Sequence, residues 1–67
     1  MKLYNVEIAQ SLGKPSLFYT ICGKDIHGSI TKAAKYANQH LRTDRYSYRD
    51  VVSVEYVGEV AGEKVIP

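Results

Sequence analysis

The sequence predicts an α+β domain with the element order ββαβ, in which one helix packs on one face of a three-stranded antiparallel sheet. Three observations predict this fold class. Residues 2–9 and 16–22 alternate in hydrophobicity, residues 25–41 carry a helical apolar stripe, and residues 49–58 alternate again. Almost every strongly apolar position is used in this core, so we expect residues 1–67 to form a single domain.

The first two alternating runs are expected to form an antiparallel hairpin. Residues 10–15 between them contain serine, glycine and proline, which are typical of a turn. Neighbouring side chains in a strand point to opposite faces, so Leu3 and Phe18 are assigned to the face away from the core. The core-facing side chains of the two runs are Tyr4, Val6, Ile8, Leu17, Tyr19 and Ile21.

The helix is expected to begin at Asp25, whose carboxylate can accept hydrogen bonds from the free N–H groups of the first turn. Ser29 is the competing N-cap, because Gly28 is a poor residue inside a helix. The helix is expected to end near Leu41 or Arg42. Its apolar stripe comprises Ile26, Ile30, Ala33, Ala34, Ala37 and Leu41, and its outward side chains are Lys32, Lys35, Gln39 and Arg42.

The last run is predicted to lie beside the first strand, which gives the strand order 2-1-3 with antiparallel neighbours. A helix that recrosses the sheet allows this order. On this strand Val52, Val54 and Tyr56 are assigned to the core face, and Val51 and Val57 to the opposite face. The predicted core consists of Val6, Ile8, Leu17, Ile21, Ile30, Ala34, Ala37, Val52 and Val54.

Charge is unevenly distributed along the chain, although the net charge is only +2. Residues 24–49 carry six positive and two negative side chains, whereas residues 50–67 carry one positive and four negative ones. No apolar stretch is long enough to span a membrane, and no signal-peptide pattern is present. Together with a single cysteine, these observations favour a cytoplasmic protein without membrane contact.

Neither a catalytic site nor a metal site is expected. Cys22, Asp25 and His27 lie together at the turn between strand and helix, where the positive end of a helix can activate a thiol. A nucleophilic cysteine also needs a base and a substrate pocket, and a packed cysteine, a capping aspartate and a surface histidine account for the same residues. His27 and His40 with one cysteine match no paired ligand spacing of zinc modules. We therefore expect a chain that is not an enzyme and uses no cofactor.

Arginine and tyrosine side chains are concentrated between the helix and the last strand. The candidate partner-binding residues are Arg42, Arg45, Tyr46, Tyr48 and Arg49. Arginine donors beside stacking rings suit a nucleic-acid backbone with unstacked bases, and the same residue types are enriched at protein-binding hot spots. A solvated loop whose tyrosines pack on the helix end is the third interpretation.

One helix can cover only one face of the sheet. The uncovered face is predicted to carry Leu3, Phe18, Val51 and Val57 among polar residues, and the outer strands have open edges. Exposed apolar patches and open edges both favour contact with another chain. This face is therefore the candidate oligomer face of a homodimer, and scattered surface apolar residues are the alternative.

Two segments resemble small phage and prophage accessory proteins of ββαβ build, among them several anti-CRISPR proteins. They are residues 25–37, DIHGSITKAAKYA, and residues 50–60, DVVSVEYVGEV. The resemblance implies a binding protein located in the host cytoplasm, without catalytic activity, that inhibits a host protein or protein–nucleic-acid complex. It carries over no site residues. Direct nucleic-acid binding through residues 42–49 and a small regulatory homodimer are the alternative functions.

Overall fold

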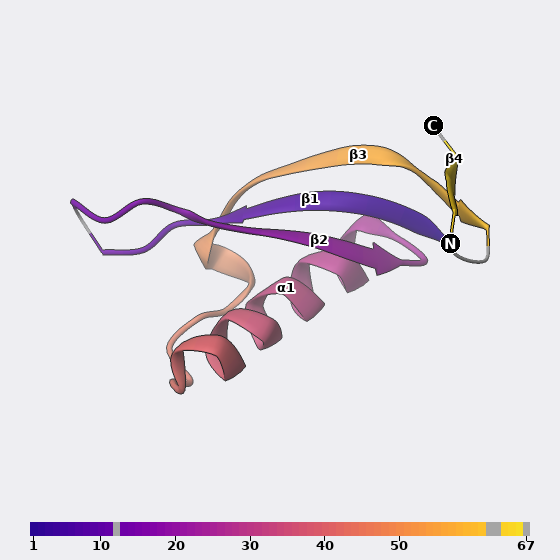
Figure 1. The fold of residues 1–67 in the computed structure, drawn as a ribbon. Coiled ribbons are helices and arrows are strands. Elements are labelled where there is room, and N and C mark those ends of the chain that lie inside the picture. The colour runs from indigo at the N-terminus through magenta and orange to yellow at the C-terminus, as the bar shows by residue number, and fades with distance from the viewer. Residues whose placement is uncertain (12, 62–63, 67) are drawn as a thin grey trace.

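The computed structural model describes residues 1–11, 13–61 and 64–66. Four antiparallel strands form one sheet in the order β2-β1-β3-β4. The strands are β1 (Lys2–Ile8), β2 (Leu17–Gly23), β3 (Val51–Ala61) and β4 (Lys64–Ile66). Helix α1 (Ile26–Leu41) lies along one face of the sheet, and a short 3-10 helix, η1 (Tyr48–Asp50), precedes β3 (Figure 1).

The predicted ββαβ fold class is confirmed, with the strand order β2-β1-β3 and one helix on the sheet. Strand β4 adds to the prediction. It pairs with the end of β3 from Glu59 to Ala61 and extends the sheet beyond the three predicted strands. Figure 1 shows β4 at the end of the sheet where the N-terminus lies.

Local chemistry fixes both ends of α1. The Asp25 carboxylate accepts a hydrogen bond from the Gly28 N–H at 2.7 Å, so Asp25 is the N-cap, as predicted first. The competing candidate, Ser29, is fully buried, and its hydroxyl donates to the Asp25 carbonyl at 2.9 Å. At the other end Arg42 adopts a left-handed conformation with φ 52°, which terminates the helix.

The core lies between α1 and one face of β1 and β2, the face that was predicted to carry their core side chains. Its buried cluster comprises Tyr4, Val6, Ile8, Ile21, Ala33, Ala37 and Tyr46, with Leu17, Tyr19, Val51 and Val54 packed against it. Ile30 and Ala34 are buried as well, as predicted. Ile26 and Leu41 belong to the predicted stripe, but they are exposed because they lie in the first and last positions of the helix.

The prediction for the start of β3 is wrong. Glu7 pairs with Ser53, but Ile8 pairs with Val51, so Val52 is an extra residue in a β-bulge. The bulge interrupts the alternation of side chains between faces. Val51 therefore packs against the core instead of lying on the uncovered face, and Val52 is 57% exposed instead of buried.

Candidate partner-binding surface

Asn38 holds the segment after α1 against the helix. Its carbonyl accepts hydrogen bonds from the N–H groups of Arg42 and Thr43. Its side-chain amide forms two further bonds to the backbone of Tyr46, one from the Tyr46 N–H at 2.9 Å and one to the Tyr46 carbonyl at 3.0 Å. Four hydrogen bonds from one residue therefore fix the path of residues 42–46.

Tyr46 is a core residue, so its assignment to the partner-binding surface needs correction. Only 7% of its surface is exposed, and it belongs to the buried cluster between helix and sheet. The Asn38 clamp turns this part of the loop inward, which a pattern of alternating arginine and tyrosine does not indicate. The buried ring is unable to stack on an incoming base or side chain.

Arg45 lies beside Tyr46 and is exposed. Its guanidinium group is 5.3 Å from the centre of the Tyr46 ring, and it donates a hydrogen bond to the Ser11 hydroxyl at 3.4 Å. These two contacts direct Arg45 toward the connection between β1 and β2. A shallow hollow of about 250 Å³ lies there, lined by Gln10, Ser11, Lys14, Leu41, Thr43, Arg45 and Tyr46.

Tyr48 lies against the beginning of α1. Its ring stacks on the His27 ring, with centroids 5.8 Å apart and an interplanar angle of 17°. Its hydroxyl lies 2.8 Å from Nδ1 of His27. The Asp50 carboxylate accepts a hydrogen bond from the Ser47 N–H at 2.7 Å and closes the turn of η1. Tyr48 is about half exposed, but one face of its ring is already occupied.

The five predicted binding residues therefore do not converge on one surface. Arg42 lies at the end of α1, Arg45 lies toward the β1–β2 connection, and Tyr48 stacks on the first turn of the helix. Arg49 is exposed in η1, and Tyr46 is buried. These residues are neighbours in the sequence, but their side chains make contacts in different parts of the structure.

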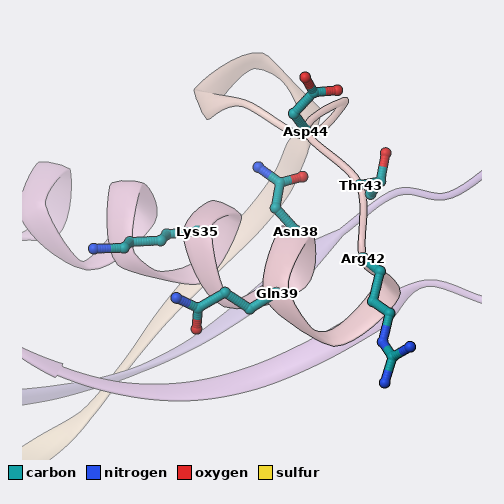
Figure 2. Close-up of a pocket in the computed structure, with 6 residues that line it drawn as sticks. All are labelled: Lys35, Asn38, Gln39, Arg42, Thr43 and Asp44. Carbon is teal, nitrogen blue, oxygen red and sulfur yellow. The ribbon is translucent and has the colours of Figure 1, made fainter.

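A broad, open hollow lies at the end of α1, and we call it the helix-end hollow. It has a volume of about 770 Å³ and is lined by Lys35, Asn38, Gln39, Arg42, Thr43 and Asp44. Figure 2 shows Lys35, Gln39 and Arg42 projecting from the helix and its end, while Asn38 is directed toward the loop that carries Asp44. Of the predicted binding residues, the hollow contains only Arg42.

The sequence contained a signal for Lys35 and Gln39. Together with Arg42, they are spaced by four and three residues, which places three polar side chains on one outward face of a helix. Their helical phase indicates outward-facing side chains but does not assign them to a site. The missing information was that the loop after the helix folds back beside this face.

The uncovered face of the sheet is more polar than predicted. The Thr20 hydroxyl donates to Oδ1 of Asn5 at 2.9 Å, and the Ser53 hydroxyl donates to Oε1 of Glu7 at 3.0 Å. Phe18 is 71% exposed beside these pairs. They border a hollow of about 400 Å³, lined by Asn5, Glu7, Phe18, Tyr19, Thr20, Ser53 and Glu55.

The predicted oligomer face is therefore only partly present. Val51 packs on the opposite side of the sheet, against the core. Leu3 and Val57 are half-buried, and Phe18 remains as the one strongly exposed member of the predicted set. The uncovered face therefore presents one exposed aromatic side chain among polar groups, and not a continuous apolar patch.

The residues considered for catalysis have structural partners. The Asp25 carboxylate caps the helix, and the His27 ring is paired with Tyr48. The Cys22 sulfur lies 3.9 Å from the sulfur of Met1. Within residues 1–11, 13–61 and 64–66, no group of three or more histidine, cysteine or acidic residues is placed to hold a metal ion.

No helix among the described residues has the length and apolar character needed to cross a membrane. In comparisons with known proteins, the sequence matches no family model, no curated protein and no solved structure. The function is therefore inferred from the residues and contacts described above.

Proposed function

We propose that this chain is a small binding protein without enzymatic activity, and that it docks on an acidic surface of a partner protein through the helix-end hollow. One observation carries this proposal. Two cationic side chains, Lys35 and Arg42, and the amide of Gln39 line an open hollow beside a loop whose path is fixed by the Asn38 hydrogen bonds. A fixed backbone reduces the entropy that is lost when the surface binds a partner.

The chemistry of the hollow fits carboxylate groups. The Arg42 guanidinium can donate two parallel hydrogen bonds to one carboxylate, and the Lys35 ammonium supplies a second positive charge. Gln39 can donate or accept, so it fits the mixed polar groups found on protein surfaces. Asp44 also lines the hollow and supplies one carboxylate acceptor, which selects against a partner that is negatively charged throughout.

Direct binding of nucleic acid is the less favoured alternative. That hypothesis required Tyr46 and Tyr48 as stacking platforms beside the arginines. The Tyr46 ring is buried in the core, and one face of the Tyr48 ring is covered by His27. The expected interface thereby loses the Tyr46 ring and one face of the Tyr48 ring, while the cationic and amide donors of the hollow remain available.

The identity of the partner class rests on the resemblance of residues 25–37 and 50–60 to phage accessory proteins. On that basis we propose that the partner is a host protein or complex that handles nucleic acid, and that binding inhibits it. A partner of this class has acidic protein surfaces as well as basic nucleic-acid channels. The charge of the helix-end hollow directs this chain to the acidic surfaces.

The proposal is tested by capture of partners from host lysate, with and without nuclease, using variants of the hollow. Lys35→Ala removes one cation. Arg42→Gly removes the other and suits the left-handed backbone at this position, so folding is preserved. Each variant is expected to reduce capture of the main partner by about tenfold, which corresponds to a loss of about 1.4 kcal/mol of binding free energy.

Lys24→Ala is the matched control, because Lys24 is exposed but lies outside the hollow. It should leave capture unchanged. Arg45→Ala and Arg49→Ala test the remaining predicted arginines separately. If Lys35→Ala and Arg42→Gly both capture the partner as well as the parent does, the helix-end hollow is not the binding surface. If nuclease abolishes capture, the chain binds nucleic acid instead of protein.

A further inference from the structure

Strand β2 is an edge of the sheet, and its outer side is available for pairing. Within the described residues it pairs only with β1, in a register that continues without interruption from Leu17 to Gly23. An edge strand presents a row of N–H and C=O groups whose chemical complement is another extended chain.

One hydrogen bond identifies which residues face outward. The Lys32 ammonium donates to the carbonyl of Cys22 at 2.8 Å. In an antiparallel strand the N–H and C=O of one residue point to the same side, and the direction alternates from residue to residue. Cys22, Thr20 and Phe18 therefore present their backbone groups to the outside, and Tyr19 and Ile21 pair with β1.

The composition of β2 leaves this edge unprotected. Its sequence, LFYTICG, contains no charged residue and no proline, and it is rich in β-branched and aromatic residues. The outer side of β3 is different, because its end from Glu59 to Ala61 pairs with β4, the strand carries Glu55, and its pairing with β1 contains two register shifts that bend it. Bulges and charges are the usual devices that prevent edge pairing, and β2 has only the Lys32 contact.

Exposed aromatic side chains border the β2 edge on both faces of the sheet. Phe18 lies on the uncovered face and is 71% exposed. On the other face, the contact between Lys32 and Cys22 places one flank of α1 beside β2. Tyr36 lies one turn further along this flank and is 46% exposed.

We propose that β2 pairs with β2 of a second copy of this chain, antiparallel and about a two-fold axis at Thr20, to form one continuous sheet. The three outward-facing residues of each strand then form about six backbone hydrogen bonds. Phe18 lies opposite Cys22 of the partner subunit, and Tyr19 lies opposite Ile21 of the partner subunit. Every facing pair except the central threonines is apolar, and no like charges are opposed.

The position of Lys32 is compatible with this dimer. Each lysine lies beside the Cys22 of its own strand, and in the proposed register the two Cys22 positions are four residues apart, about 13 Å along the strands. This separation exceeds the Debye length of about 8 Å at physiological ionic strength. Lys32 also occupies a carbonyl that pairing requires, so it opposes association without preventing it.

The dimer has a consequence for the helix-end hollow. A two-fold axis perpendicular to the sheet leaves both helices on the same face. The outer sides of the two α1 helices, with Lys35 and Arg42, then point in the same direction. A partner with two acidic patches could bind both copies, and its apparent affinity would rise without any new contact.

Sedimentation of the full chain over a range of concentrations tests the dimer. We expect a species of twice the 7.5 kDa monomer mass at micromolar concentration. Phe18→Lys places a charge on the edge and should weaken association by at least about tenfold. Val52→Lys is the matched control, because Val52 is also exposed and apolar but lies on β3, and it should leave association unchanged. Lys32→Met frees the Cys22 carbonyl and should strengthen association.

A cross-linking experiment tests the register. Thr20→Cys in a Cys22→Ser background places one thiol at the two-fold axis, where facing Cα atoms about 5.5 Å apart allow a disulfide. Rapid formation of a covalent dimer is expected, and Val52→Cys in the same background should not form one. A strict monomer at all concentrations overturns the proposal, as does a dimer that is insensitive to Phe18→Lys. If the chain is a strict monomer, an extended segment of another protein becomes the better candidate for pairing with the β2 edge.

Discussion

The close approach of β2 and α1 at Gly23 leads to a prediction that can be worked out from the structure. A methyl group added at Gly23 would lie less than 3.0 Å from the Ser29 hydroxyl oxygen. Ser29 is fully buried, and its hydroxyl group donates a hydrogen bond to the Asp25 carbonyl at 2.9 Å. Gly23→Ala therefore forces the hydroxyl out of its hydrogen bond or pushes the helix away from the strand.

The expected cost follows from three terms. Overpacking of a closed site costs about 1–3 kcal/mol, and the lost hydrogen bond costs about 1 kcal/mol. Replacing glycine lowers the entropy of the unfolded chain and returns about 0.4–1 kcal/mol. Gly23→Ala should therefore reduce the free energy of unfolding by about 2–3 kcal/mol, or lower the Tm by roughly 10–20 °C in a domain of this size.

The double variant separates the clash from other effects. Ser29→Ala removes the conflicting oxygen, and the next atoms from the added methyl, the Asp25 carbonyl oxygen and the Ser29 Cβ, lie at 3.6 Å, an ordinary contact distance. Ser29→Ala alone should cost about 1 kcal/mol, because the Asp25 carbonyl keeps its bond from the Ser29 N–H. In that background Gly23→Ala should be neutral or slightly stabilising, so the coupling energy should be about 2–3 kcal/mol or slightly more.

The assay is urea unfolding of the four proteins, followed by far-ultraviolet circular dichroism and analysed with a common m-value. The parent, the two single variants and the double variant complete the cycle. If the two substitutions are additive within about 0.5 kcal/mol, Gly23 and Ser29 do not compete for the same space, and the reasoning is refuted. If Gly23→Ala alone is as stable as the parent, the close approach itself is wrong.

Three further predictions concern the loop, the bulge and a titrating tyrosine. Asn38→Ala should reduce the free energy of unfolding by about 2–3 kcal/mol in urea titrations, because it removes both side-chain bonds to the Tyr46 backbone; a loss below about 0.5 kcal/mol would mean that the clamp is unimportant. Val54→Ala should cost about 1–3 kcal/mol and Val52→Ala less than about 0.5 kcal/mol in the same measurement, and equal costs would contradict the bulge. Burial, and to a lesser extent Tyr46, raises the pKa of Tyr19 above 10.0, so the folded state holds this proton more tightly than the unfolded chain does. The stability that this linkage contributes is fully present below pH 10 and is lost as the pH rises further. Tyr19→Phe should therefore reduce the decline of the Tm at alkaline pH in thermal melts. If the Tm falls equally with pH in the parent and in Tyr19→Phe, the linkage is excluded.

The sequence by itself determined the elements that depend on local periodicity. Tyr4, Val6 and Ile8 alternate in a way that only a half-buried strand explains, and they are buried as predicted. The beginning of the helix was also readable, because the Asp25 carboxylate reaches an N–H group only three residues away. In the first case the alternation of side chains is an obligatory property of a strand. In the second case the hydrogen-bonding partner is a near neighbour in the sequence.

The tertiary structure alone decided where side chains lie once two distant segments had to fit together. The β3 sequence alternates from Val52 to Tyr56, but Val51 and Val52 are both apolar, and only the pairing with β1 shows that Val52 is the bulged residue and that Val51 belongs to the core. A bulge is a property of two paired strands, so an apolar doublet in one strand does not by itself show which of its two residues faces the core. The burial of Tyr46 also depends on a residue outside its own segment. The side-chain amide of Asn38, eight residues earlier, forms hydrogen bonds with both the N–H and the carbonyl of Tyr46.

The candidate binding surface divides in the same way. The sequence by itself determined which residues are charged and that Lys35, Gln39 and Arg42 share the outer side of the helix. Only the tertiary structure decided that they meet Asp44 in one hollow, while Arg45 and Tyr48 are drawn to other contacts. Charge and helical phase are local properties of the chain, whereas the grouping of side chains on a surface depends on how a loop returns across the fold.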